Sequence, residues 1–237
     1  MGLKKYLRKT MGGNTLFYRG CMVNAVHPQI GENYEDVLRR GGVKFIVLEA
    51  EICCGSPVKK AGEERDFQNT AERVWDLFKS RGVVRIITPC PACFHMFKSV
   101  YPKLLREWDI EVEHCTEVIV KLISSGKLKV EKGKETYVFH DPCHLGRSEG
   151  VYDEPREIVK AVGELEEFPD NRELSLCCGG GGGVAANCHK LAGKMAGKRA
   201  EQAKGKMMVT SCPMCYHMLK KKGKARELSE LFKGNNQ

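Results

Sequence analysis

Two short stretches decide the fold of this chain: Thr88-Pro-Cys90-Pro-Ala-Cys93-Phe-His95-Met96 and, 122 residues later, Thr210-Ser-Cys212-Pro-Met-Cys215-Tyr-His217-Met218. The adjacent pair Cys53-Cys54 followed by glycine returns in the same way as Cys177-Cys178. Ten of the twelve cysteines fall into two sets of five, which are Cys21, Cys53, Cys54, Cys90 and Cys93, then Cys143, Cys177, Cys178, Cys212 and Cys215. Corresponding members are 122 or 124 residues apart, so the sequence indicates an internal duplication with one five-cysteine module in each half.

Strand and helix patterns alternate along both halves. Short β-branched or aromatic runs lead toward the cysteines at residues 14–19, 43–48, 83–88, 137–140, 165–168 and 207–210. Amphipathic helical patterns lie between them at residues 33–40, 63–80, 93–106, 116–125, 155–162, 185–203 and 214–221. This alternation predicts an α/β fold with two pseudo-symmetric repeat halves, each a small, largely parallel sheet with flanking helices. The cysteines then lie at the carboxyl ends of the strands, where such sheets bind ligands, and between the halves.

The polar, lysine-rich stretch around residues 126–134 has the composition of a linker. We therefore expect five parts, which are a basic N-terminal segment (1–13), a first domain (14–125), the linker (126–134), a second domain (135–225) and a C-terminal tail (226–237).

Composition limits the class of protein. Hydrophobic residues make up 42% and charged residues 29%, as in ordinary soluble globular chains, and no apolar run approaches the roughly 20 residues that span a bilayer. The basic start lacks an apolar export core, so we expect a cytoplasmic protein with thiols rather than disulfides. The net charge of +9 comes from scattered Lys and Arg among 30 acidic residues, which favours solvated helix faces, or a shell around anionic thiolates, over nucleic-acid binding.

Thiolates are soft ligands that select zinc, copper(I) or iron–sulfur clusters. A Cys-x-x-Cys pair serves zinc and iron clusters equally well, but a structural zinc site and an ordinary cubane cluster both close with four ligands. A fifth thiolate must bridge two irons or leave a position open to substrate, which describes a reactive iron–sulfur centre. Two zinc modules in a scaffolding protein remain the alternative.

Glycines follow each cysteine pair. Gly55 and Gly179 are expected to turn the backbone sharply and to let it approach the inorganic core, where a Cβ would collide. The run Gly179–Gly183 opens a helix near Val184, whose N-terminal N–H groups can face an anionic cluster. The run also contains Gly180-x-Gly182-x-x-Ala185, but it follows ligand cysteines without a clean preceding strand, so we do not interpret it as a dinucleotide motif. We expect this chain to bind no flavin or nicotinamide.

The doubled pattern Cys-x31-Cys-Cys-Gly onward to Cys-Pro-x-Cys resembles the CCG-domain (cysteine-rich domain) iron–sulfur family, whose best-known member is the catalytic subunit of heterodisulfide reductase. Phe139-His-Asp-Pro-Cys143-His-Leu-Gly-Arg147 is also similar to the family's second copy, and the resemblance covers residues 15 to about 220. It implies that each cysteine set ligates one noncubane [4Fe-4S] cluster. The two clusters would face each other across a substrate disulfide, each taking one sulfur.

The same resemblance implies partners and a function. Larger relatives carry a ferredoxin-like segment, so electrons would be exchanged through a ferredoxin-like iron–sulfur subunit and a flavoprotein subunit, with a membrane complex reached only through a partner. The substrate would be a small or protein-bound disulfide, reduced here or formed from two thiols. The alternative is an electron-transfer subunit between a flavoprotein dehydrogenase of the lactate, glycolate or glycerol-3-phosphate type and a quinone or thiol carrier.

Several side chains near the cysteines are candidates for further roles. His140, His144 and Arg147 flank Cys143 and could supply a proton or positive charge to a departing thiolate, or serve only as structural residues beside a strand end. His95 and His217 recur two residues past each final cysteine, which favours contact with the ligands over direct ligation. Arg19 is a weaker candidate of the first kind. The remaining cysteines, Cys115 and Cys188, are expected to be inert.

Overall fold

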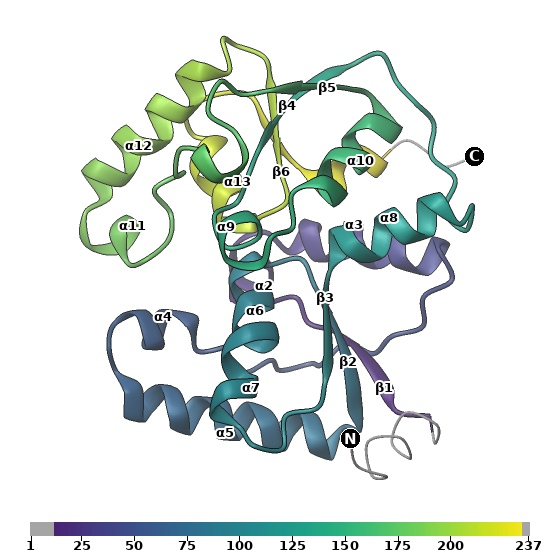
Figure 1. Cartoon of the computed structure of the whole chain (residues 1–237), viewed down its shortest axis with the longest axis vertical. Coiled ribbons are helices and arrows are strands. Elements are labelled where there is room, and N and C mark those ends of the chain that lie inside the picture. The colour runs from purple at the N-terminus through teal and green to yellow at the C-terminus, as the bar shows by residue number, and fades with distance from the viewer. Residues whose placement is uncertain (1–11, 234–237) are drawn as a thin grey trace.

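The computed structural model describes residues 12–233, which form two parallel sheets placed one above the other (Figure 1). Residues 1–11, most of the expected basic N-terminal segment, lie outside the described residues, as do residues 234–237. The first sheet has the order β1 (Asn14–Phe17), β2 (Val83–Thr88), β3 (Glu111–His114). The second has the order β5 (Glu164–Glu167), β4 (Thr136–His140), β6 (Met207–Thr210), β7 (Ala225–Glu227). Every strand pairs with its neighbour in parallel.

The two sheets share one strand order, which confirms the pseudo-symmetric α/β fold. The segment 43–48, expected as a strand, makes only a single parallel bridge between Leu16 and Ile46. It lies beside β1 as β5 lies beside β4, so it is the reduced counterpart of that edge strand. Strands β3 and β7, at the opposite edges, were not predicted.

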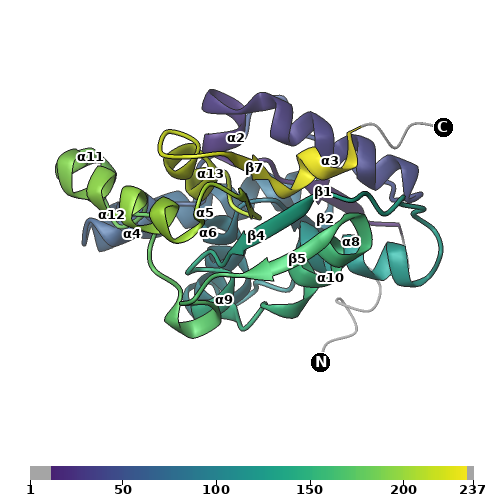
Figure 2. The same ribbon diagram turned by 90° about the horizontal axis from the view of Figure 1, so that it is seen from above.

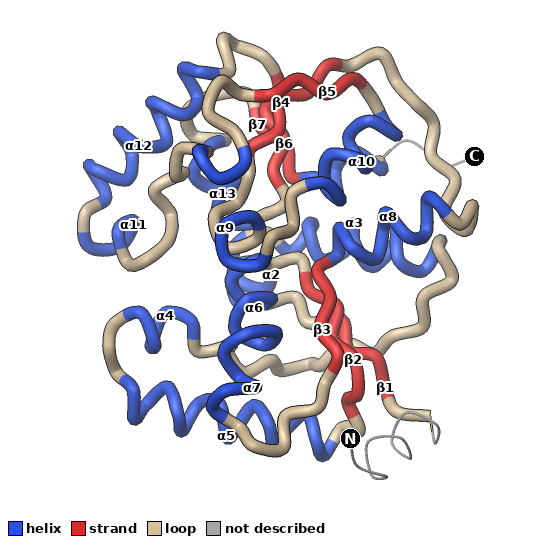
Figure 3. The backbone as a smooth tube through the Cα atoms, in the orientation of Figure 1, coloured by secondary structure: helices blue, strands red, loops and turns tan. Residues whose placement is uncertain are grey.

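Helices connect the strands in both halves (Figure 3). The first half contains α2 (Cys21–Val26), α3 (Pro28–Arg40), α4 (Ser56–Lys60), α5 (Glu64–Ser80), α6 (Pro91–His95), the π-helical turn η1 (Met96–Val100), α7 (Tyr101–Leu104) and α8 (Cys115–Ser124). The second half contains α9 (Gly146–Glu149), α10 (Asp153–Val162), the 3-10 turn η2 (Arg172–Leu174), α11 (Val184–Asn187), α12 (His189–Gln202), α13 (Pro213–Leu219) and the 3-10 turn η3 (Leu228–Phe232). No helix within residues 12–233 is long and apolar enough to cross a bilayer.

Two of the predicted helices are interrupted. The π-helical turn interrupts the helix expected at 93–106 just before Pro102, which has no N–H to continue the α-helical ladder. The helix expected at 185–203 divides at Cys188, whose backbone leaves the helical region. The Asn187 side chain donates to the Gly183 carbonyl at 3.1 Å and closes the short α11 on itself.

Three of the apolar clusters in residues 12–233 make up most of the hydrophobic core. One apolar cluster lies between the first sheet and α5, and another lies between the second sheet and α12. The largest cluster joins the halves, because it contains Phe17 and Ile119 of the first half and Phe139 and Ile158 of the second. Here α8 packs on α10 and α3 packs on η3 (Figure 2). The two halves therefore fold around a shared core.

Residues 226–232, expected to belong to a C-terminal tail, pack against the second sheet and the shared core. Strand β7 pairs with β6 across the expected boundary, and η3 buries Leu228 and Phe232 in the shared core. The Tyr34 hydroxyl of the first half also donates to buried Glu227 at 2.8 Å. The described end of the chain is therefore part of the interface between the halves.

Candidate metal centre

The five sulfurs of the first set converge although three separate segments supply them. Cys21 begins α2 after β1, Cys90 follows β2, and Cys93 lies one helical turn later in α6. The Cys53–Cys54 pair arrives on the loop before α4. Cys53 makes side-chain hydrogen bonds with Cys21 and Cys54, Cys54 with Cys93, and Cys93 with Cys90. The set is thus one connected group of thiols.

The second set repeats this arrangement contact for contact. Cys177 bonds with Cys143 and Cys178, Cys178 with Cys215, and Cys215 with Cys212. The segments that supply these residues follow β4 and β6 and precede α11, as the duplication predicts.

Both groups open into one cavity of about 370 Å³ between the halves. Eight of the ten cysteines line it, four from each set, together with Met22, Pro57, Lys60, Pro91, His144, Met214 and Gly180–Gly183. The other two, Cys53 and Cys177, lie behind it against Cys21 and Cys143. A molecule in this cavity would touch both sulfur groups at once.

Hydrogen bonds within each group favour one thiolate. Bonds from Cys21, Cys54 and the Gly55 N–H lower the pKa of Cys53 to about 2. In the second group, bonds from Cys143, Cys178 and the Gly179 N–H lower the pKa of Cys177 to about 2 in the same way. A ready thiolate with further thiols in contact is the donor set that a soft metal or an iron–sulfur cluster requires.

The glycines after each pair turn the chain as expected, with φ of +75° at Gly55 and +78° at Gly179. A Cβ at either glycine would collide with other residues of the protein, however, and not with the cysteine sulfurs. The Phe67 ring lies 2.8 Å from the Cβ position at Gly55, and the Ala192 carbonyl oxygen of α12 lies 2.7 Å from that at Gly179. Gly20 does face a ligand sulfur, because its Cβ would lie 3.1 Å from Cys93 Sγ. A comparison of the two halves does not single out Gly20, because the corresponding residue of the second half is Pro142.

Comparison with known proteins identifies the family of this chain. Residues 15–98 and 137–220 each match the cysteine-rich domain, CCG. The chain belongs to the CCG family. The assignment made from the sequence is confirmed, and the two matched segments carry the two sulfur groups.

Several curated relatives of this chain are larger proteins. The EtfAB:quinone oxidoreductase of Syntrophomonas wolfei is 35% identical over 92% of this chain and 32% of its own length. The probable iron-sulfur-binding oxidoreductase FadF of Bacillus subtilis is 35% identical over 86% of this chain and 30% of its own. One subunit of the dihydromethanophenazine:CoB--CoM heterodisulfide reductase of Methanosarcina acetivorans is 32% identical over 85% of this chain and 52% of its own. The chain thus spans from about a third to about a half of these relatives. Among solved structures, the glutamate racemase of Aquifex pyrophilus matches 92% of this chain and 80% of its own at 16% identity, with a TM-score of 0.38.

Of the three residues proposed beside Cys143, only His144 lines the cavity. Its Nδ1 lies 3.4 Å from Cys143 Sγ and its Nε2 lies 2.6 Å from Lys60 Nζ of the other CCG copy. Burial and the Lys60 charge lower the pKa of His144 to about 4, so the ring is neutral at pH 7. Sequence reasoning missed Lys60, which no motif marks.

His140 and Arg147 lie outside the cavity lining. Buried His140 has a ring nitrogen within 4.8 Å of the Cys178 and Cys215 sulfurs, and its Nδ1 accepts from Arg199 Nε at 3.0 Å. Arg147 Nη1 donates to the carbonyls of Glu173 and Ser175, each at 2.9 Å. Arg147 therefore holds the loop that leads to Cys177 rather than facing a substrate.

His95 and His217 make equivalent contacts across the two copies. His95 Nδ1 lies 2.6 Å from Glu149 Oε1, and His217 Nδ1 lies 3.1 Å from His27 Nε2. Glu149 and His27 are themselves 122 residues apart, so each recurring histidine ties its own ligand turn to the same place on the opposite copy.

The remaining candidates take no part in the sulfur groups. Arg19 pairs with Glu35 of α3. Cys115 is buried in the shared core and Cys188 is exposed between α11 and α12.

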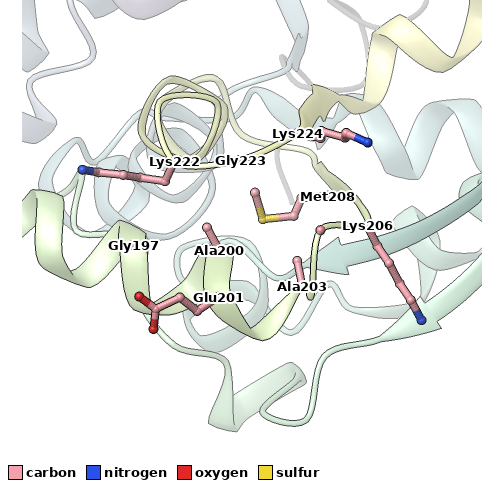
Figure 4. A pocket seen from close by; sticks show the side chains of 10 residues that line it. Gly197, Ala200, Glu201, Ala203, Lys206, Met208, Lys222, Gly223 and Lys224 are labelled. Carbon is pink, nitrogen blue, oxygen red and sulfur yellow. The ribbon is translucent and has the colours of Figure 1, made fainter.

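A second hollow lies between α12 and the segment 222–224 (Figure 4). Lys206, Lys222 and Lys224 line it with Glu201 and Met208. No thiol lines it, so it is separate from the metal centre.

Proposed function

We propose that this chain is the catalytic iron–sulfur part of an oxidoreductase that reduces a disulfide, or oxidises two thiols, between two noncubane [4Fe-4S] clusters. The observation that carries the proposal is the single cavity lined by four cysteines of each set. A site that served only to relay electrons would not need both sulfur groups open to the same space.

The donor sets support this choice of cofactor. Each group connects five sulfurs, one more than zinc or a cubane cluster uses. Backbone N–H groups also donate to the sulfurs, as Gly179 does to Cys177 at 3.3 Å and Gly180 to Cys178 at 3.5 Å. Such bonds stabilise the negative charge that a cluster places on its ligands. The ligands would be Cys21, Cys53, Cys54, Cys90 and Cys93 in the first copy, and Cys143, Cys177, Cys178, Cys212 and Cys215 in the second.

Cleaving a disulfide takes two electrons and two protons and releases two thiols. Clusters held by the two cysteine sets would supply the electrons, which a partner subunit would deliver one at a time. The chain itself supplies walls and proton donors: Met22, Pro91 and Met214 enclose the disulfide, and Lys60 stands at the cavity wall beside His144. Because Lys60 donates to His144 Nε2, the ring's own proton lies on Nδ1, toward Cys143. We propose Lys60 as the source of one proton, for one departing thiolate, with His144 holding it in place, while the second proton comes from water.

The names of the relatives support the oxidoreductase class and the need for partners. The relatives compared above are named as oxidoreductases or as part of a reductase. A further relative, from Methanothermobacter marburgensis, is named as one of the subunits of a fumarate reductase (CoM/CoB) and is 33% identical. We propose that a ferredoxin-like iron–sulfur subunit and a flavoprotein exchange electrons with this chain, and that it works in the cytoplasm.

One observation favours a second candidate. Two relatives at 35% identity are an EtfAB:quinone oxidoreductase and FadF, neither of them named a disulfide reductase. In this alternative the chain passes electrons between a flavoprotein and a quinone or thiol carrier, and no substrate bond is cleaved in the cavity.

Anaerobically purified protein tests the proposal. Two four-iron clusters give about eight irons and eight acid-labile sulfides per chain. Turnover with reduced viologen and a panel of low-molecular-weight disulfides supports disulfide chemistry, and it should be lost in Cys54→Ala but kept in Cys188→Ala, whose thiol lies outside both groups. Full cluster content without turnover on any disulfide would favour the electron-transfer alternative. Zinc without sulfide would overturn both.

A further inference from the structure

The duplication gives every residue around the first sulfur group a counterpart around the second, so the surroundings of the two can be compared position by position. Using the same offsets of 122 and 124 residues, Tyr18 corresponds to His140, Glu51 to Ser175 and Trp75 to Arg199. The ligands are the same in both copies, but the pairs Glu51/Ser175 and Trp75/Arg199 differ in charge.

The second group has a buried guanidinium behind it. Arg199 of α12 is fully buried, and its Nε, Nη1 and Nη2 donate to His140 Nδ1, the Asp170 carbonyl, Gln202 Oε1 and Ser175 Oγ at 2.8–3.0 Å. Its guanidinium carbon also lies 3.5 Å from the centre of the Phe168 ring. Five contacts hold this cation in one position.

No carboxylate neutralises Arg199 directly. Each of its hydrogen-bond partners in the described residues is an uncharged group. The nearby Asp141 carboxylate is bound by both Nη atoms of Arg156, at 2.7 and 3.0 Å. Burial lowers the pKa of Arg199 to about 10, so it stays protonated at neutral pH. The carboxylates of Asp141 and Asp170 and the Cys215 sulfur act on Arg199 through space, without a hydrogen bond to it.

Arg199 also sets the state of His140. A guanidinium can only donate, so His140 Nδ1 must accept, and the ring is neutral with its proton on Nε2. The ring lies beside the Cys178 and Cys215 sulfurs as a fixed dipole.

The first group has no such cation at the matching position. Tyr18 takes the place of His140 and donates to the Ile52 carbonyl at 2.7 Å, and Trp75 takes the place of Arg199 among the aromatic side chains of that core. Glu51, in the place of Ser175, accepts from the backbone N–H groups of Arg19 and Gly20, each at 2.8 Å. An acid and aromatic rings therefore surround the first group where a cation supports the second.

We infer that Arg199 acts as a positioning residue through His140 and holds the cluster of the second CCG copy at a higher reduction potential than the cluster of the first. A buried positive charge stabilises the reduced, more negative form of a cluster, and low local dielectric strengthens the effect. The inference rests on the proposed pair of clusters. Its consequence is an order: the second cluster is reduced first, and an electron that enters at the first moves toward the second.

An anaerobic redox titration followed by EPR tests this directly in the wild-type protein. Two signals should appear at separate potentials. Cys178→Ala should alter the one at the higher potential, and Cys54→Ala should alter the one at the lower potential. Arg199→Gln should lower the midpoint potential of the second signal by at least about 59 mV. For one electron, that shift is a tenfold change in the ratio of reduced to oxidised cluster. The first signal should stay in place.

Two matched variants separate charge from folding. Lys198→Gln removes the same charge one residue away, where the side chain is exposed and solvent screens it, and should move neither potential. Arg199→Lys keeps the positive charge, so the midpoint potential of the second signal should stay close to that of the wild type. Equal potentials in the wild type, or an Arg199→Gln protein with eight irons and unmoved signals, would overturn the inference while leaving the two clusters intact. Iron analysis that finds fewer than two clusters in the wild type would instead overturn the proposed function.

Discussion

Substituting Gly179 by alanine tests how tightly the second sulfur group is built against α12. Two costs add at this position. The left-handed backbone, with φ of +78°, costs a non-glycine residue about 1 kcal/mol. The new Cβ would also lie 2.7 Å from the Ala192 carbonyl oxygen and 3.0 Å from its Cα, well inside the 3.4 Å at which ordinary contact begins.

These clashing atoms belong to the helix backbone, so no side chain can rotate away. Helix α12 must move or the turn that carries Cys178 must open, and overpacking of this kind costs about 2 kcal/mol. We expect Gly179→Ala to lose about 3 kcal/mol of unfolding free energy in total. The variant should also contain less of the second cluster, because the hydrogen bond from the Gly179 N–H to Cys177 Sγ is distorted.

Gly182→Ala is the matched control in the same glycine run. Its φ is +63°, but a Cβ there would have nothing within 4 Å, so only the backbone cost of about 1 kcal/mol applies. Urea unfolding followed by circular dichroism, with iron analysis of the purified proteins, measures both effects. If the two variants lose the same stability and keep the same iron content, the packing argument is wrong.

Three further changes have defined outcomes. Cys178→Ala should alter the EPR signal of the second cluster while the first signal persists; simultaneous loss of both would show that the copies do not bind their clusters independently. Burial raises the pKa of Glu227 to about 7, so this carboxyl loses its proton at a lower pH in the unfolded chain than in the folded one. The free energy of unfolding should therefore fall by about 3 kcal/mol as the pH rises from 4.5 through 7. Glu227→Gln, which can still bond Tyr34 and Ser229, should flatten that part of a pH series of unfolding curves, and an unchanged slope would contradict the assignment. Arg156→Met leaves the Asp141 carboxylate buried without its ion-pair partner and should cost about 3 kcal/mol in urea unfolding, whereas Lys160→Met on the exposed face of the same helix should cost almost nothing.

Part of this structure was readable from the residues. The bounds of β2 and β6 are those predicted, because β-branched runs end there at a Cys-Pro-x-Cys turn whose proline starts a helix. Strand β3, Glu-Val-Glu-His, has no such run and exists because β2 offers it an edge. Strand β7 spans only three residues and is supported by β6 and the shared core. Strands of this kind depend on tertiary context, which local pattern does not contain.

The two sulfur groups followed from cysteine spacing, but their surroundings did not. Arg199 lies 59 residues from His140, in a lysine-rich helix that a sequence pattern assigns to solvent. Lys60 reaches His144 from the other copy, 84 residues away. The first contact depends on how α12 packs against β4, and the second on how the halves are stacked, and no residue spacing encodes either.

The reciprocal ties of His95 to Glu149 and of His217 to His27 have an evolutionary consequence. In each case the same position of one copy contacts the same partner position of the other copy. An isologous dimer makes such reciprocal contacts across its two-fold axis. A single ancestral copy carrying both positions could have self-associated through this surface before its gene was doubled. In the duplicated chain the two corresponding positions differ, because one holds the Glu149 carboxylate and the other the His27 imidazole.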